Sequence, residues 1–198
     1  PSGPEHYVEM QPNDKGWLGL EPLGIWLGVG NGRLVCYDKD GNEIGGHTLN
    51  HVNLAEIESD KLEMEICQNR TNLLDYGFAV TSFAYPYGHY NEEAKQLVMD
   101  CGYGNARGVS GGPDTIPPAD KYAIKAMPYV VSDTSLSKMM RYIIDVENEG
   151  GGWAIFIFHR VCSGCSQYAV DLDTFSKFAA RLADQRQNGL IIKTVGEV

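Results

Sequence analysis

Short apolar stretches alternate with amphipathic, helix-like segments over the last three quarters of the chain, and this alternation limits the possible folds most. Residues 78–84 and 153–158 form apolar runs of strand length, and the second has the composition of a strand buried on both faces. Residues 60–76 instead carry apolar side chains at helical spacing. Because successive strand–helix units build parallel sheets with right-handed crossovers, the pattern predicts an α/β fold.

Residues that favour helix ends mark the limits of the remaining elements. Asn91 is the expected N-cap of a helix at residues 92–101, with acidic residues in its first turn. Either Asp133 or Thr134 is the expected cap of a helix that runs to Asn148. A helix at residues 173–188 and a last strand at residues 190–195 complete the predicted set.

The length of 198 residues suits one domain with a substantial core, so we predict that residues 1–198 form a single domain. A closed barrel is the expected form, with an open doubly wound sheet as the alternative. No GxGxxG motif follows a predicted strand to support dinucleotide binding. Residues 1–32 are atypical, because residues 16–32 are rich in Gly and Trp and show no helical period.

Charge and hydropathy exclude two classes of partner. The formal net charge is −10, and the chain has no cluster of Lys and Arg to bind a phosphate backbone, so a nucleic-acid partner is not expected. The longest apolar run, at residues 153–158, is far too short to span a bilayer. The chain begins without a charged and apolar leader, and we expect a mature secreted form.

Five cysteines are many for a cytosolic protein of this length. A disulfide between Cys67 and Cys101 would join two predicted helices and contribute about 3 to 4 kcal/mol on the chain-entropy model. Cys162 and Cys165 form a CxxC motif, which suits a local disulfide, half a zinc site or a redox pair, and we favour the disulfide. Cys36 has no predicted partner.

Two histidines separated by four positions, His47 and His51, follow the apparent end of a strand. On a helical turn this spacing places both rings on one face, where they can bind one metal ion. Imidazole suits zinc and its first-row neighbours. The pair therefore predicts a metal site, although paired histidines also occur as ordinary surface or core residues.

Two later strand ends also carry distinctive residues: residues 83–88, which contain Pro86 and Tyr87, and residues 156–159, which end at His159. In this order, the HxxxH pair and these two segments resemble the motifs of the polysaccharide deacetylases, carbohydrate esterase family 4. The resemblance covers about residues 33–198. It implies a single distorted (β/α) barrel of the polysaccharide deacetylase type and one divalent metal, zinc or alternatively cobalt.

The resemblance also implies a role for each matching residue. His47 and His51 would be metal ligands, the backbone N–H of Tyr87 would stabilise the oxyanion, and His159 would be the catalytic acid. The family begins with a strand ending in Thr-Phe-Asp-Asp, and the comparable stretch here contains Asn13 and Asp14. In one register Asn13 takes the position of the catalytic base and Asp14 completes the metal triad.

The sequence departs from the family at three points. An amide at Asn13 cannot accept a proton as a carboxylate does. In the other register Asp14 is the base and Lys15 replaces the metal Asp, which suits a cation site less well. The second departure is Ala84, which stands where many members of the family have Arg. The third is the segment between Asp14 and His47, which is shorter than usual in the family.

The leading functional hypothesis is a secreted, metal-dependent hydrolase that removes acetyl groups from chitin or chitooligosaccharides, peptidoglycan or acetylated xylan. Its partner would be an acetylated polysaccharide or oligosaccharide, and the sequence does not indicate an oligomeric state. The alternative is a catalytically impaired carbohydrate-binding protein on the same fold, which Asn13 and Ala84 favour. A third hypothesis is a cysteine hydrolase that uses Cys162 with His159.

Overall fold

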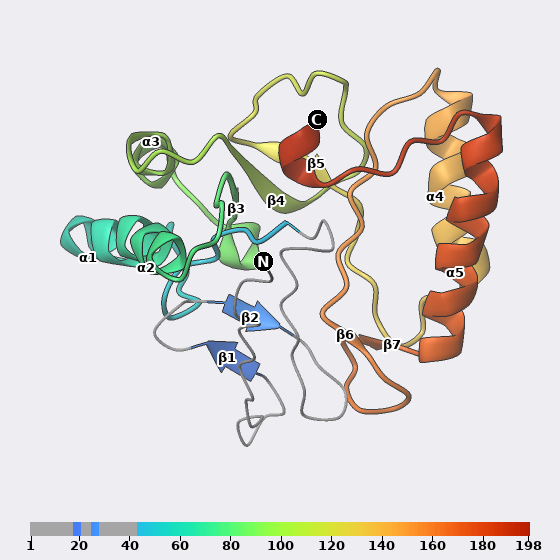
Figure 1. The fold of residues 1–198 in the computed structure, drawn as a ribbon, viewed down its shortest axis with the longest axis horizontal. Coiled ribbons are helices and arrows are strands. Elements are labelled where there is room, and N and C mark those ends of the chain that lie inside the picture. Colours follow the sequence, from blue (N-terminus) through green and yellow to red (C-terminus); the bar gives the residue numbers. More distant parts are fainter. Residues whose placement is uncertain (1–17, 21–24, 28–42) are drawn as a thin grey trace, which may run out of the picture.

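The computed structural model describes residues 18–20, 25–27 and 43–198 (Figure 1). Within residues 16–32, where the sequence pattern predicts no element, two short strands pair antiparallel. They are β1 (Leu18–Leu20) and β2 (Ile25–Leu27). Asn13, Asp14 and Cys36 lie outside the described residues, so the predictions about them stay predictions.

A parallel three-stranded sheet occupies the centre of the molecule, with the order β3-β4-β5 (Figure 1). The strands are β3 (Ser82–Ala84), β4 (Asn105–Gly111) and β5 (Ile124–Ala126). Gly46 extends the array beyond β3 through a parallel bridge to Phe83. Beyond β5, the N–H of Met127 donates to the carbonyl of Ile155 at 2.9 Å. The predicted α/β class with parallel strands is confirmed, whereas a closed barrel stays a prediction.

The helices α1, α2 and α3 lie on one side of this sheet (Figure 1). The helix predicted at residues 60–76 is present, and a π-helical turn interrupts it. Its parts are α1 (Ser59–Glu63), η1 (Met64–Gln68) and α2 (Asn69–Asp75). Asn91 caps α3 (Glu92–Asp100) as predicted, because its side chain accepts a hydrogen bond from the N–H of Ala94. The predicted disulfide between Cys67 and Cys101 is also present.

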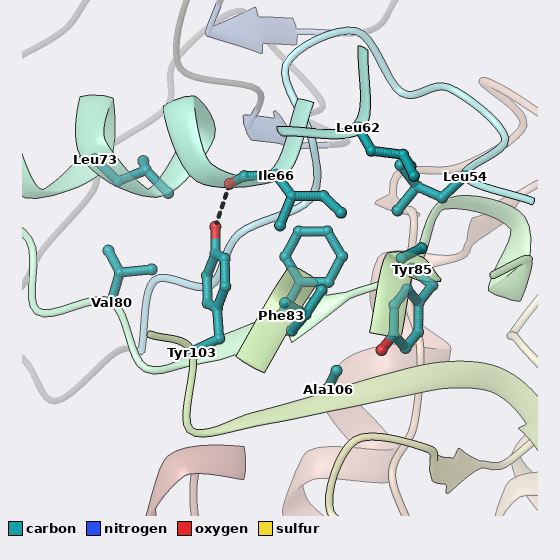
Figure 2. Close-up of a cluster of buried hydrophobic side chains, with 11 residues drawn as sticks. Leu54, Leu62, Ile66, Leu73, Val80, Phe83, Tyr85, Tyr103 and Ala106 are labelled. Carbon is teal, nitrogen blue, oxygen red and sulfur yellow. Dashed lines mark hydrogen bonds between the residues drawn. The ribbon is translucent and has the colours of Figure 1, made fainter. Parts of the chain in front are cut away.

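A hydrophobic core fills the space between these helices and the sheet (Figure 2). Phe83 and Tyr85 of the β3 segment point into it together with Ala106 of β4. Side chains alternate along a strand, so Ala84 and Arg107 face the opposite side of the sheet. That opposite side carries the second core cluster, with Ile124, Ala126, Ile155 and Ile157 as its buried members.

The helices α4 (Leu136–Asn148) and α5 (Leu172–Gln185) lie side by side on the far side of the molecule (Figure 1). The predicted caps of α4 were wrong, because Ser135 accepts the hydrogen bond from the N–H of Lys138. The hydroxyl of Thr134 instead accepts from the N–H of Val131 at 3.0 Å. Because the Thr134 hydroxyl is engaged in this local bond, Ser135 and not Thr134 caps the helix.

The strand predicted at residues 153–158 is reduced to isolated bridges at Trp153 and Phe158. Its side chains nevertheless alternate as a strand requires. Ile155 and Ile157 belong to the second core cluster, which we call the inner cluster. Phe156 and Phe158 instead pack against the helices α4 and α5 in a third core cluster. This alternation places the next residue, His159, on the inner side with Ile157.

The strand predicted at residues 190–195 was wrong. The chain is irregular there and ends in a 3-10 turn, η4 (Val195–Glu197). Thr194 and Glu197 form a capping box, and the N–H of Gly196 donates to the carboxylate of Glu43 at 2.8 Å. These side-chain bonds replace the ladder of a strand. Among the residues described, no helix is long and apolar enough to cross a bilayer.

Candidate active site

The segment that carries His47 and His51 is a loop, so the prediction of a helical turn was wrong. Thr48 and His51 have φ angles of +65° and +53°, which lie in the left-handed region and not in the α-helical one. The loop still brings the two rings together, with centroids 4.8 Å apart and planes at 74°. Tertiary contacts, and not helical spacing, therefore create the pair.

Glu65 holds this loop from the neighbouring helical segment. One oxygen of its carboxylate accepts hydrogen bonds from the N–H groups of Leu49 and Asn50 at 3.0 and 2.9 Å. The other oxygen accepts from the side-chain amide of Asn50 at 2.7 Å. The Glu65 side chain is only 4% exposed, and its position in the π-helical turn η1 aims it at the loop. A π-helical turn often marks a functional site.

Asn69, the first residue of α2, fixes the start of the same loop. Its buried side-chain oxygen accepts from the N–H of His47 at 3.1 Å and from the hydroxyl of Tyr103 at 3.2 Å. Sequence reasoning missed both Glu65 and Asn69. The signal that could have revealed them is two polar residues, four positions apart, among the buried apolar residues Leu62, Ile66 and Leu73.

His47 has a defined tautomer. Its Nδ1 atom lies 2.7 Å from the carbonyl oxygen of Ala84, and a carbonyl only accepts, so Nδ1 carries the proton. The lone pair is then on Nε2, which is the arrangement of a metal-ligating histidine with a backbone carbonyl as second partner. Burial lowers the pKa of His47 to about 3, although the bond to Ala84 opposes this shift. The ring is therefore neutral at neutral pH, as a metal ligand must be.

Tyr87 lies directly beside the second histidine. Its ring is 4.6 Å from that of His51, and its side chain is 56% exposed. Tyr87 follows Pro86 in the 3-10 turn η2 (Pro86–Gly88) and has a φ of +58°. The turn thus places the Tyr87 ring next to the ring of His51.

His159 interacts electrostatically with the histidine pair. Burial lowers its pKa below the ordinary value, and the charges of Arg107 and His51 act in the same direction. The pKa of His47 responds in turn to His51, Arg107 and His159. These interactions couple His159, from a distant part of the chain, to the two histidines of the loop.

Arg107 is a further residue that sequence reasoning missed. It lies in β4 directly beside Ala84 in the parallel register, so both side chains face the histidines' side of the sheet. Burial lowers the pKa of its guanidinium to about 10, which leaves it charged at neutral pH. The signal available in the sequence was a single cationic residue directly after the apolar Ala106.

The described part of the chain provides two of the predicted metal donors. Within residues 43–198, no three His, Cys, Asp or Glu side chains form a group suited to a metal ion. His47 and His51 are therefore a pair, and Asp14, the third predicted donor, lies outside the described residues. Cys162 is disulfide-bonded to Cys165, so the hypothesis of a Cys162 nucleophile is wrong, because a disulfide offers no thiolate.

A family model supports part of the sequence resemblance. Residues 33–106 match the family model of the polysaccharide deacetylases. The solved structure of the Streptococcus pyogenes deacetylase PplD in complex with acetate is similar over 48% of this chain and 42% of its own length. The identity is 18% and the TM-score 0.43. No curated protein sequence matches the chain.

The matched residues contain His47, His51 and Tyr87, and His159 lies beyond them. Residues 33–106 are therefore similar to part of a polysaccharide deacetylase domain, in agreement with the resemblance of the motifs.

Proposed function

We propose that this protein is a secreted, metal-dependent carbohydrate deacetylase. The observation that carries the proposal is the histidine pair itself. The ring centroids of His47 and His51 lie 4.8 Å apart. The hydrogen bond from Nδ1 of His47 to the carbonyl of Ala84 leaves Nε2 of His47 available to a cation. The two disulfides support an extracytoplasmic location, because such bonds persist in oxidising compartments.

For the fold, we propose a single distorted (β/α) barrel. Helices flank the central sheet on both sides, and the inner cluster continues from β4 to residues 153–157 (Figure 1). Glu43 supports closure, because its carboxylate accepts from Ser82 beside the first part of the sheet and from Gly196 at the end of the chain. These bonds hold the last segment of the chain against the segment that begins at Glu43, and this proximity supports a closed arrangement.

The histidine pair fits a divalent cation, zinc or alternatively cobalt. His47 and His51 would hold it together with Asp14, and neutral imidazoles with a fixed tautomer suit such an ion. When bound, the ion would supply Lewis-acid polarisation of the acetyl carbonyl and lower the pKa of a water.

The chain's own groups account for the oxyanion and the protons. The backbone N–H of Tyr87 would stabilise the negative charge on the acetyl oxygen after water attacks the acetyl carbon. Asn13, at the base position, cannot take the proton of that water. His159 has a lowered pKa and is neutral at neutral pH, so it can take this proton and then donate it to the leaving amine or alcohol as the bond to the acetyl carbon breaks. The products are acetate and the free amine or hydroxyl.

Acetate release tests the proposal. The protein should release acetate from acetylated chitooligosaccharides, peptidoglycan fragments or acetylated xylan with zinc or cobalt, and a chelator should abolish the release. His47→Ala and His51→Gln should lose bound metal by elemental analysis. His89→Ala is the matched control, because His89 is an exposed histidine in the neighbouring turn. No acetate from any of the three polymers would contradict the proposal.

A carbohydrate-binding protein without turnover is the second candidate, and Asn13 and Ala84 favour it. Asn13→Asp separates the two candidates. Acetate release by the variant alone would show that the natural chain binds glycans and does not cleave them, whereas turnover by both would support His159 as the group that moves the protons.

A further inference from the structure

We propose that Tyr129 and Tyr168 form a binding platform beside His159 that takes a pyranose ring of the glycan. The inference rests on the proposed function and adds to it the surface that recognises the sugar. Neither tyrosine belongs to a segment whose sequence resembles a deacetylase motif.

The sheet registers place both tyrosines on the side of His159. The parallel bridge between Val130 and Phe158 sets Tyr129 beside Ile157. Strands β6 (Arg160–Val161) and β7 (Ala169–Val170) are parallel, with Arg160 opposite Ala169, so Tyr168 lies beside His159. Neighbouring residues of parallel strands present their side chains on the same face. The two tyrosines therefore border the inner face on which His159 lies.

The ring geometry shows a cluster of three aromatic side chains. The centroid of Tyr129 is 5.5 Å from that of His159 with the planes at 88°, and the centroid of Tyr168 is 5.6 Å away. The two tyrosine rings are 6.1 Å apart. These distances are those of direct aromatic contact.

Exposure separates the platform from an ordinary core. The side chain of Tyr129 is 42% exposed, whereas the adjacent Val130 is 1% exposed. Folding therefore buries Val130 and leaves much of the Tyr129 ring in contact with water next to the proposed proton carrier. A large exposed aromatic side chain of this kind suits recognition of a ligand that is apolar on one face and polar at its edge. A pyranose ring has C–H groups on its faces and hydroxyls at its edge.

The loop that carries Tyr168 is held in place before any ligand binds. The disulfide between Cys162 and Cys165 closes its first part. The N–H of Ser132 donates to the carbonyl of Gln167 at 3.0 Å, which ties the loop to the Tyr129 segment. A preorganised platform loses little conformational entropy on binding.

Kinetics with two substrates test the inference. Acetylated chitooligosaccharide offers sugar rings to the platform, whereas p-nitrophenyl acetate carries its acetyl group on a small aromatic leaving group and has no sugar. Tyr129→Ala should raise KM for the oligosaccharide about tenfold, leave its kcat within about twofold, and lower kcat/KM for p-nitrophenyl acetate by no more than about twofold. Tyr168→Ala should act in the same direction, and Tyr129→Phe should retain the affinity of the natural protein. Tyr76→Ala is the matched control, because Tyr76 is 57% exposed at the end of α2.

Two outcomes would overturn the platform. Equal losses on both substrates would show that the tyrosines only support His159, and unchanged KM for the oligosaccharide would show that they contact no sugar. If the natural protein releases no acetate, calorimetric binding of the same oligosaccharide replaces KM. Weaker binding by Tyr129→Ala would then support the platform although the enzyme proposal fails, and unaltered or absent binding would overturn it.

Discussion

The Nδ1 atom of His47 lies 2.7 Å from the carbonyl oxygen of Ala84, the last residue of β3. Ala84 also donates its own N–H to the carbonyl of Gly46 at 2.9 Å, so the strand and the histidine loop are joined by main-chain groups. Any residue at position 84 offers the same carbonyl. The absence of an arginine at position 84 therefore leaves the orientation of His47 intact. It removes only a charged side chain that would orient the catalytic base.

Removal of the Glu65 carboxylate should loosen the histidine loop. Glu65→Ala leaves the N–H groups of Leu49 and Asn50 without their acceptor, at a cost of about 2 to 4 kcal/mol in the free energy of unfolding. The affinity for zinc should fall by about 10- to 100-fold, as for other residues that orient metal ligands. Denaturant titration and metal competition measure the two effects.

Glu63→Ala is the control for this change, since Glu63 is exposed in the same helical segment and should alter stability by less than about 0.5 kcal/mol. Equal zinc affinity in Glu65→Ala and Glu63→Ala would show that Glu65 does not position the loop.

Acid should destabilise the metal-free protein through His47. Its pKa falls from 6.5 in the unfolded chain to about 3 in the folded one because of burial. Between these values the unfolded state binds a proton that the folded state does not, so stability is greatest above pH 6.5 and decreases as the pH falls toward 3. The slope from this group is at most about 1.4 kcal/mol per pH unit. Thermal unfolding of the chelator-treated protein should show it, and His47→Gln should reduce the slope.

The pH dependence of kcat/KM should report on His159. Burial and the Arg107 charge lower its pKa below 6.5, and a residue that first takes a proton must be neutral. Activity should therefore be retained at pH 7 and decline only below pH 6.5. His159→Gln should reduce the rate by at least about 100-fold. A maximum in acid with little activity at pH 7 would mean instead that His159 must start protonated.

The disulfide between Cys67 and Cys101 should contribute substantially to stability. It joins η1 to the end of α3 across 34 positions, and the chain-entropy model assigns such a loop about 3 to 4 kcal/mol. Cys67→Ser with Cys101→Ser should lower the midpoint of chemical unfolding accordingly. The disulfide between Cys162 and Cys165 closes only three positions. Its removal by Cys162→Ser with Cys165→Ser should therefore lower the free energy of unfolding by less. Equal losses would contradict the entropic explanation.

Elements that depend on local pattern were predicted well from the sequence. The helical segment before Gly77 and the helix capped by Asn91 follow from apolar spacing and one side-chain cap. No strand forms at residues 190–195, where Ile191 and Ile192 remain 75% and 56% exposed. An apolar run forms a strand only where a neighbour pairs with it, and the sequence does not reveal the neighbour.

The sequence by itself determined which groups are available: two imidazoles four positions apart and a late histidine after an apolar run. Tertiary structure decided how they are used. The left-handed residues Thr48 and His51 turn the loop, Glu65 and Asn69 hold it, and β4 brings Arg107 alongside. These contacts join residues far apart in the chain, so the spacing of the motif could indicate a metal pair but could not specify the geometry that makes one.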